Sequence, residues 1–291
     1  MTRHAGLSQW YEQVSTHLPQ LSRPQALGLA LWSMGIVLAQ RVGLVMVAVV
    51  MAHVFMSNVR AMRGRLREWY LDGAAKRGDK RRTLDVRTCF APLLRWVIHL
   101  HPAGSTELAL AMDASTLGQR FTVLSVHVVI RGCALPVAWA IVRATDKGAW
   151  RPHWEALFQD LTGSVPDGWR VIVLADRGLY AKWLYEAIVA VGWHPFLRIN
   201  RQGTYCPTDS DTFRPLMQVI TVRGTTWRGT VRCFTAARQL TCTLVARWDA
   251  GYTDPWIVLT DLPPETADVA WYGLRAWIEC GYKDMKRGGW H

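Results

Sequence analysis

The spacing of hydrophobic residues changes along the chain and separates a helical region from a sheet-forming one. Residues 8–58 contain few glycines and long apolar runs interrupted by helix-compatible polar residues, which predicts two or three packed helices. A further short helix is expected at 90–99. After residue 106, short runs rich in β-branched and aromatic residues alternate with helical patterns. This alternation is typical of a mixed α/β sheet covered by helices.

The sheet-forming region begins with an apolar run that ends in Asp113. Two β-rich runs follow, 121–130 and 133–142, and Arg131-Gly132 between them indicates a hairpin turn. The patterns that come next predict a helix at 154–161, a buried strand at 169–175, a helix at 180–191 and a strand at 195–199. Asp176 directly follows the expected buried strand at 169–175.

The last third of the chain changes character again. We expect a β-rich insertion, with strands at 217–222, 230–235, 240–248 and 256–259. A final helix is predicted from a capping hydroxyl at Thr266 to about Arg287, before Gly288-Gly289. The expected domains are a helical module at 1–100, a catalytic core at 101–202, the insertion at 203–265 and the last core helix at 266–291.

Positive charge is concentrated in the first third of the chain. The formal net charge is +12, and residues 1–100 carry 14 Lys and Arg against 5 Asp and Glu. Many of these lie in an Arg-rich segment, 60–87, that includes Arg81 and Arg82. This distribution favours an anionic polymer or surface as partner, with phosphate contacts from a helix end and the loop after it. A solvated charged face is the alternative interpretation.

Three features bear on the compartment. The six cysteines form no C-x-x-C pair and have no zinc-type His spacing, which favours free thiols in a reducing cytoplasm. The apolar run Val42–Met56 is short for a membrane span, and we expect a buried helix instead. The N-terminus shows no export signal.

Three carboxylates are candidates for metal binding. Asp113 and Asp176 each come at the C-terminal end of an expected strand, and Glu279 lies on the expected last helix. Taken singly, an Asp after a strand is more often a turn former or helix cap than a ligand. Carboxylates that converge from different elements suit hard divalent cations such as Mg²⁺, and a pair of such ions can promote phosphodiester cleavage.

The last helix carries a more specific pattern. Tyr272, Arg275, Glu279 and Lys286 lie at offsets of 0, 3, 7 and 14, which on an α-helix fall within about 60° of one another. One face is therefore expected to carry a carboxylate flanked by two cations and a phenol. A solvated helix face is the alternative.

The pattern Tyr272-x2-Arg275-x3-Glu279-x6-Lys286 resembles the signature of bacterial insertion-sequence transposases of the three-carboxylate (DDE) type. The branch concerned has a β-rich insertion before the catalytic Glu. The resemblance extends to the residues around Asp113 and Asp176 and to the helical, Arg-rich N-terminal region. It implies a ribonuclease-H-like mixed sheet flanked by helices, with the insertion and an all-helical N-terminal module.

The resemblance also implies the chemistry. Asp113, Asp176 and Glu279 would be catalytic and would bind two divalent metal ions, Mg²⁺ with Mn²⁺ as a substitute. Tyr272, Arg275 and Lys286 would hold phosphates of the transposon end. Metal-dependent hydrolysis at the transposon ends would be followed by attack of the freed 3′-hydroxyl on target DNA. In relatives that cleave through a hairpin, an indole of the insertion stacks on a flipped base, and Trp227 is a candidate for that role.

The resemblance further implies double-stranded DNA as partner, a homodimer in the DNA complex, no membrane and a bacterial cytoplasmic location. Chains of this family continue well past the signature Lys, whereas this sequence stops at His291, so we expect a truncated copy. The main alternative is an inactive remnant that only binds DNA. A hydrolase with two carboxylates as acid and base, for example on a glycoside, would leave Arg275, Lys286 and the basic first third unexplained.

Overall fold

The computed structural model describes residues 5–78, 82–146, 150–235, 237 and 239–287. The chain divides into two compact units, one formed by residues 1–100 and 280–291 and the other by residues 101–279. Each unit is described by itself. Helix α8 (Ala276–Arg287) begins in the second unit and continues into residues of the first.

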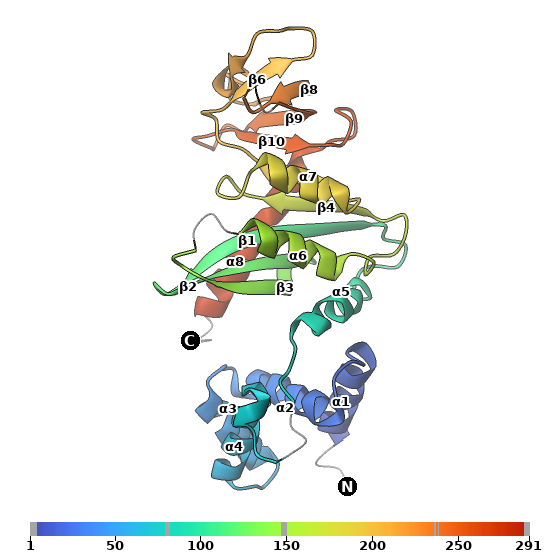
Figure 1. Cartoon of the computed structure of the whole chain (residues 1–291), viewed down its shortest axis with the longest axis vertical. Helices are drawn as coiled ribbons and strands as arrows, with labels where there is room; N and C mark the ends of the chain where they lie inside the picture. Colours follow the sequence, from blue (N-terminus) through green and yellow to red (C-terminus); the bar gives the residue numbers. More distant parts are fainter. Residues whose placement is uncertain (1–4, 79–81, 147–149, 236, 238, 288–291) are drawn as a thin grey trace. The chain divides into compact units, whose positions relative to one another are not determined.

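The first unit is helical in its described part (Figure 1). Its α-helices are α1 (Ala5–His17), α2 (Arg23–Ala39), α3 (Leu44–Val54), α4 (Val59–Tyr70) and α5 (Phe90–Ile98). Single 3₁₀ turns occur at η1 (Gly73–Ala75) and η2 (Arg87–Cys89). The helices at 5–54 confirm the prediction of packed helices, and the Arg-rich segment adds α4 to them.

Helix starts in this unit are set by local sequence. Asn58 caps α4, because its side-chain oxygen accepts hydrogen bonds from the backbone N–H groups of Arg60 (2.8 Å) and Ala61 (3.3 Å). Ser22 and Gln25 form a capping box at the start of α2. Caps of this kind satisfy backbone donors that the first helical turn leaves without partners.

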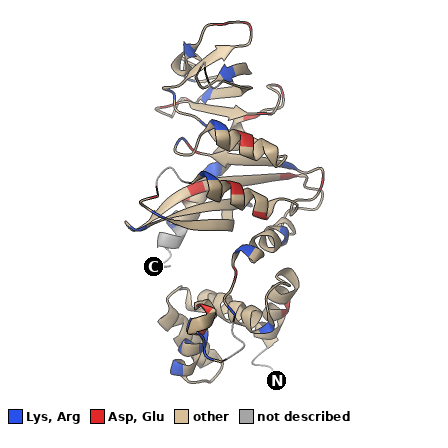
Figure 2. Cartoon of the chain, in the orientation of Figure 1, with Lys and Arg blue, Asp and Glu red and all other residues tan. Residues whose placement is uncertain are grey.

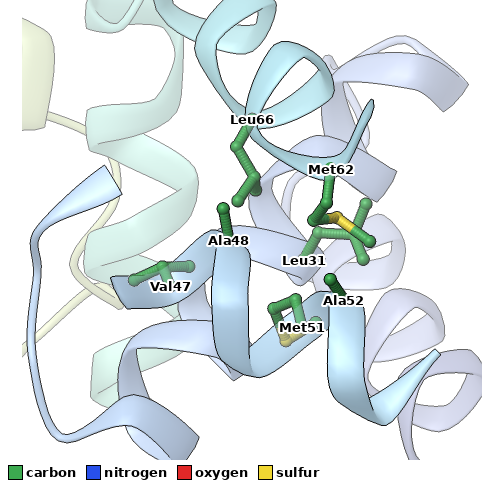
Figure 3. Close-up of a cluster of buried hydrophobic side chains, with 7 residues drawn as sticks. All are labelled: Leu31, Val47, Ala48, Met51, Ala52, Met62 and Leu66. Carbon is green, nitrogen blue, oxygen red and sulfur yellow. The ribbon is translucent and has the colours of Figure 1, made fainter. Parts of the chain in front are cut away.

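A buried apolar cluster joins α2, α3 and α4 (Figure 3). Its members are Leu31, Val47, Ala48, Met51, Ala52, Met62 and Leu66. The expected buried helix in 42–56 is α3, although it also exposes Val45, Met46 and Val49. Among the described helices, none is long and apolar enough to cross a membrane alone; α2 and α3 pass by length and composition only as a pair bent by 95°.

The second unit is built on a ten-stranded sheet in the order β3-β2-β1-β4-β5-β10-β9-β8-β6-β7. The first five strands are β1 (Glu107–Leu117), β2 (Phe121–Ile130), β3 (Cys133–Arg143), β4 (Arg170–Ala175) and β5 (His194–Arg198). The others are β6 (Thr204–Pro207), β7 (Arg214–Pro215), β8 (Thr225–Cys233), β9 (Leu240–Trp248) and β10 (Trp256–Thr260). β1, β4 and β5 run parallel, and the remaining pairs are antiparallel.

Helices cover this sheet on both faces. α6 (Arg151–Leu161) packs against β2 and β3, and α7 (Lys182–Ala190) packs against β5. η5 (Val269–Arg275), a 3₁₀ helix that leads into α8, packs against β1, β4, β9 and β10. Figure 1 shows α6 and α7 in front of the sheet and the start of α8 behind it. This mixed α/β architecture, with strand order 3-2-1-4-5 in its first half, confirms the expected ribonuclease-H-like fold class.

One expectation for the insertion region was wrong, and two short strands there were missed. Residues 217–222 form no strand in this described stretch; Leu216–Gln218 is a 3₁₀ turn, η3. The short strands β6 and β7 were not predicted, because four and two residues are too few to show an alternating pattern. β10 pairs with β5, so the insertion strands extend the core sheet.

Candidate active site

Asp113 and Asp176 lie at matching positions of two parallel neighbours. The β1–β4 ladder pairs residues that are 63 positions apart, from Glu107 with Arg170 to Ala111 with Leu174. Asp113 and Asp176 are also 63 positions apart, two residues beyond the last of these pairs. The register of the sheet therefore brings the two carboxylates to the same edge.

The expectation that Asp113 ends its strand was wrong. β1 continues to Leu117, and Asp113 stands opposite Ser125 of β2. Asp176, in contrast, directly follows the end of β4 at Ala175. Because β4 stops while β1 and β2 continue, the side of β1 that faces β4 loses its partner strand near Asp113. The carboxylate is thereby left only partly buried, with 17% of its side chain exposed.

The segment that carries Arg275 and Glu279 is not the single α-helix that was expected. Asp268, not Thr266, caps the start, because the Asp268 carboxylate accepts from the backbone N–H of Ala270 (2.8 Å). The chain then forms η5 as far as Arg275, and α8 begins at Ala276. A 3₁₀ helix has three residues per turn, so Tyr272 and Arg275 still share one face.

Arg275 connects all three carboxylates. Its Nη2 donates to Asp113 Oδ1 (3.1 Å) and to Asp176 Oδ2 (3.3 Å), and its Nη1 donates to Glu279 Oε1 (3.1 Å). The Arg275 side chain is 8% exposed, whereas that of Glu279 is 74% exposed. The structure thus gathers residues from β1, from the loop after β4, from η5 and from α8 around one buried guanidinium.

Whether these carboxylates can hold a metal ion depends on that guanidinium. Oxygen donors are the right chemistry for Mg²⁺ or Mn²⁺. However, among the described residues no group of three or more His, Cys, Asp or Glu side chains is placed to hold a metal ion. The oxygens of Asp113 and Asp176 instead converge on Nη2 of Arg275. The donor types fit a divalent cation, but their arrangement fits an arginine.

Tyr272 lies in an aromatic and cationic setting beside this cluster. Its ring packs edge to face on Trp256, with ring centres 5.4 Å apart, and the guanidinium of Arg198 lies 5.9 Å from the ring centre. Burial raises the pKa of the Tyr272 hydroxyl, and the positive charges of Arg275 and Arg198 partly oppose that rise. A tyrosine hydroxyl whose pKa lies above its ordinary value stays protonated at neutral pH and can donate a hydrogen bond.

Polar groups on β1 and β2 that were not singled out in the sequence also support Asp113. The hydroxyl of Ser115 donates to Asp113 Oδ2, and His127 Nε2 is 2.9 Å from the hydroxyl of Ser125. Burial lowers the pKa of His127, with the Ala134 backbone and the Asp113 charge acting in the opposite sense. The i, i+2 spacing of Asp113 and Ser115 on a strand was the available sequence signal, because alternate residues share a face.

The remaining candidate residues are Lys286, Arg81, Trp227 and Arg82. Lys286 belongs to α8, but its side chain is outside the described part of the structure. Arg81 is not among the described residues. Trp227 is half-buried on β8, where its ring packs edge to face on Tyr205 with centres 6.2 Å apart. β8 is four strands away from β4 in the sheet, so the strand order places this indole away from the carboxylates.

Arg82 belongs to a groove within the first unit. The groove has a volume of about 970 Å³, and its basic lining residues are Arg23, Arg65, Lys76 and Arg82. Two hydrogen bonds hold lining residues in place: Lys76 Nζ donates to the carbonyl of Arg82 (2.9 Å), and Trp69 Nε1 donates to the carbonyl of Gln25 (2.9 Å). Figure 2 marks the basic positions of α4 in blue. This groove combines cations with an indole and is the candidate surface for a polyanion.

No protein-family model matches the sequence, and no curated protein is similar to it. A solved structure described as a cryo-EM structure of a piggyBac transposase synaptic complex with hairpin DNA is similar, with a TM-score of 0.44 and 13% sequence identity. The similar region covers 91% of this chain and 59% of that chain, so this chain spans about three fifths of its length. A TM-score this low supports no assignment.

Proposed function

We propose that this chain is a three-carboxylate DNA transposase, which cleaves transposon ends and transfers the freed 3′-hydroxyl end to target DNA. The observation that carries the proposal is the Arg275 guanidinium, which contacts Asp113, Asp176 and Glu279 at once. Three carboxylates from distant parts of the sequence, held at one edge of a ribonuclease-H-like sheet, are suited to phosphodiester chemistry.

Each residue of the cluster has a distinct role in this proposal. Asp113, Asp176 and Glu279 would hold two Mg²⁺ ions, with Mn²⁺ as a substitute. Such ions, when bound, lower the pKa of a nucleophilic water or hydroxyl and stabilise the leaving oxygen. The protonated hydroxyl of Tyr272 and the charges of Arg275 and Lys286 would orient a phosphate at the edge of the sheet. His127, buried and held neutral through its lowered pKa, would keep positive charge away from the Asp113 side of β2.

DNA binding is assigned to a separate surface. Arg81 and Arg82, together with the basic groove of the first unit, would contact the backbone of double-stranded DNA at the transposon ends. We further propose a homodimer in the DNA complex, because two transposon ends must be brought together, and a location in the bacterial cytoplasm.

The test is strand cleavage on DNA that carries the inverted repeats flanking the coding region, with Mg²⁺ or Mn²⁺. The protein should cleave, and Asp176→Asn should not, because the amide cannot replace the charge of the carboxylate. Glu155→Gln is the matched control: it also removes one carboxylate, from an exposed ion pair with Arg151 on α6. Cleavage by Asp176→Asn at the rate of the control would contradict the proposal.

A second candidate function, DNA binding without catalysis, is favoured by the groove, because its cations do not depend on the carboxylates. It predicts salt-sensitive binding to the same DNA, no metal-dependent cleavage by the unaltered protein, and no effect of Asp176→Asn. The cleavage experiment therefore separates the two functions.

A further inference from the structure

We infer that Arg275 is an internal counter-ion that closes the carboxylate cluster, and that a divalent cation enters only when the Arg275 guanidinium leaves it. The inference rests on the proposed function, in which these carboxylates hold cations. It assigns to Arg275 a positioning and gating task that precedes any contact with DNA.

The geometry supports a closed cluster. One nitrogen, Nη2, is shared by Asp113 and Asp176, while Nη1 of the same guanidinium contacts Glu279. The guanidinium is planar and carries one positive charge, so it offsets one of the three negative charges of the ionised carboxylates without a metal. The side chains of Arg275 and Asp113 are 8% and 17% exposed, so the contact between them is screened less by solvent than a surface pair.

A guanidinium and a divalent cation compete for the same carboxylate oxygens. Asp113 Oδ1 lies 3.1 Å from Nη2 of Arg275. Because Asp113 Oδ1 and Asp176 Oδ2 converge on Nη2, an ion bound by both oxygens would lie close to that nitrogen or in its place. Like charges at such a separation repel strongly inside a protein. Metal binding at Asp113 and Asp176 must therefore displace the arginine or be weakened by it.

Two local features suit Arg275 to move. Its buried Nε has no hydrogen-bond partner among the described residues, so the contacts with the three carboxylates leave one donor of the guanidinium unsatisfied. Arg275 is also the last residue of η5, the 3₁₀ helix that leads into α8, so it lies at the junction of two helix types and not inside a regular α-helix. Two oxygens of a phosphate diester can accept hydrogen bonds from two N–H groups of the guanidinium at once. A bound phosphate can therefore draw the guanidinium away from the carboxylates.

The experiment measures Mn²⁺ binding directly, by the loss of the electron paramagnetic resonance signal of free Mn²⁺, and needs no catalytic activity. We expect Arg275→Gln to bind Mn²⁺ about tenfold or more tightly than the unaltered protein, because removal of one partner of a buried charge cluster has large effects. Arg275→Lys should show a smaller gain, since one ammonium cannot span all three carboxylates. Arg151→Gln, which breaks an exposed ion pair on α6, is the matched control and should bind as the unaltered protein does.

The double variant Asp176→Asn with Arg275→Gln should lose the gain, which would locate the ion at this cluster. Equal Mn²⁺ affinity in the unaltered protein, Arg275→Gln and Arg275→Lys would overturn the inference and leave the metal site standing. Failure of all of them to bind Mn²⁺ would overturn the proposed function as well. If Arg275→Gln does not fold without metal, recovery of its circular dichroism on addition of Mn²⁺ would support the inference, and Arg275→Lys supplies the affinity comparison.

Discussion

Asp113 and Asp176 share a single donor atom, Nη2 of Arg275, although Asp113 lies on β1 and Asp176 directly follows β4, 63 residues later in the sequence. The shared donor makes the two carboxylates parts of one charge cluster. Glu279 joins the same guanidinium through Nη1, but from a far more exposed position.

Because Asp113 is much less exposed than Glu279, replacing each carboxylate by its amide should lower the free energy of unfolding by different amounts. Asp113→Asn should lower the free energy of unfolding by about 1–3 kcal/mol, because it leaves the buried Arg275 without the full charge of one partner. Glu279→Gln should change it by no more than about 1 kcal/mol, as expected for a solvent-screened pair. Urea unfolding of both variants measures this. Equal losses of unfolding free energy would show that Asp113 is no more tightly coupled to Arg275 than Glu279 is. Both substitutions should also abolish cleavage while binding to the transposon end persists.

The basic groove predicts a change in salt dependence. Replacing Arg81 and Arg82 by Ala should weaken DNA binding and reduce the slope of log affinity against log salt by about 1 for each phosphate that the protein no longer neutralises. Arg214→Ala, which removes an exposed charge from β7, is the control and should leave the slope unchanged. An unchanged slope in the variant that lacks Arg81 and Arg82 would exclude this groove as the DNA-binding surface.

Packing of α2 against Trp69 predicts opposite effects of one substitution at two helical glycines. A Cβ on Gly28 would lie 2.0 Å from Cδ1 of Trp69, so Gly28→Ala should destabilise the protein by about 1–3 kcal/mol through overpacking. Gly64 on α4 has no atom within 4 Å of such a Cβ, and Gly64→Ala should stabilise by up to about 1 kcal/mol through helix propensity. Thermal unfolding of both variants tests this, and a stabilised Gly28→Ala variant would contradict the packing described.

His127 predicts a loss of stability in mild acid. Burial holds its folded-state pKa below the ordinary value of 6.5, so the unfolded chain takes up the proton first as the pH falls. The unfolding free energy should therefore be full above pH 6.5 and decline below it. His127→Gln should remove this part of the decline in urea titrations between pH 7.5 and 5. An identical decline in the variant would assign the acid sensitivity to other groups.

Local sequence was sufficient where one turn determines the structure. The hairpin of β2 and β3 was predicted with its bounds nearly as found, because Arg131 and Gly132 occupy the positive φ values (48° and 79°) that a tight hairpin turn requires. β9 was found with the bounds predicted from its β-branched and aromatic residues. In these cases neighbouring residues alone specify the conformation.

Other features depend on contacts that a single sequence does not display. The spacing of Arg275 and Glu279 indicated a shared helix face, but not that the guanidinium would turn towards Asp113, 162 residues earlier. The change from a 3₁₀ helix to an α-helix at Ala276 was missed because both helix types tolerate the same apolar spacing over a short segment. β1 extends past Asp113 because β2 continues to pair with it, which is a property of the sheet.

The pairing of β5 with β10 has a consequence for chain length. Arg198 pairs with Val258, so the residues between the two strands begin and end as close neighbours in the sheet. Topologically, everything from Ile199 to Pro255 is one greatly enlarged hairpin loop. The entropy of closing a flexible loop grows only logarithmically with its length, so residues can be added between the paired strands of this insertion at small energetic expense. β1 and β4, which position Asp113 and Asp176, would keep their register through such changes, so new specificity could be acquired in this part of the chain without disturbing the carboxylate cluster.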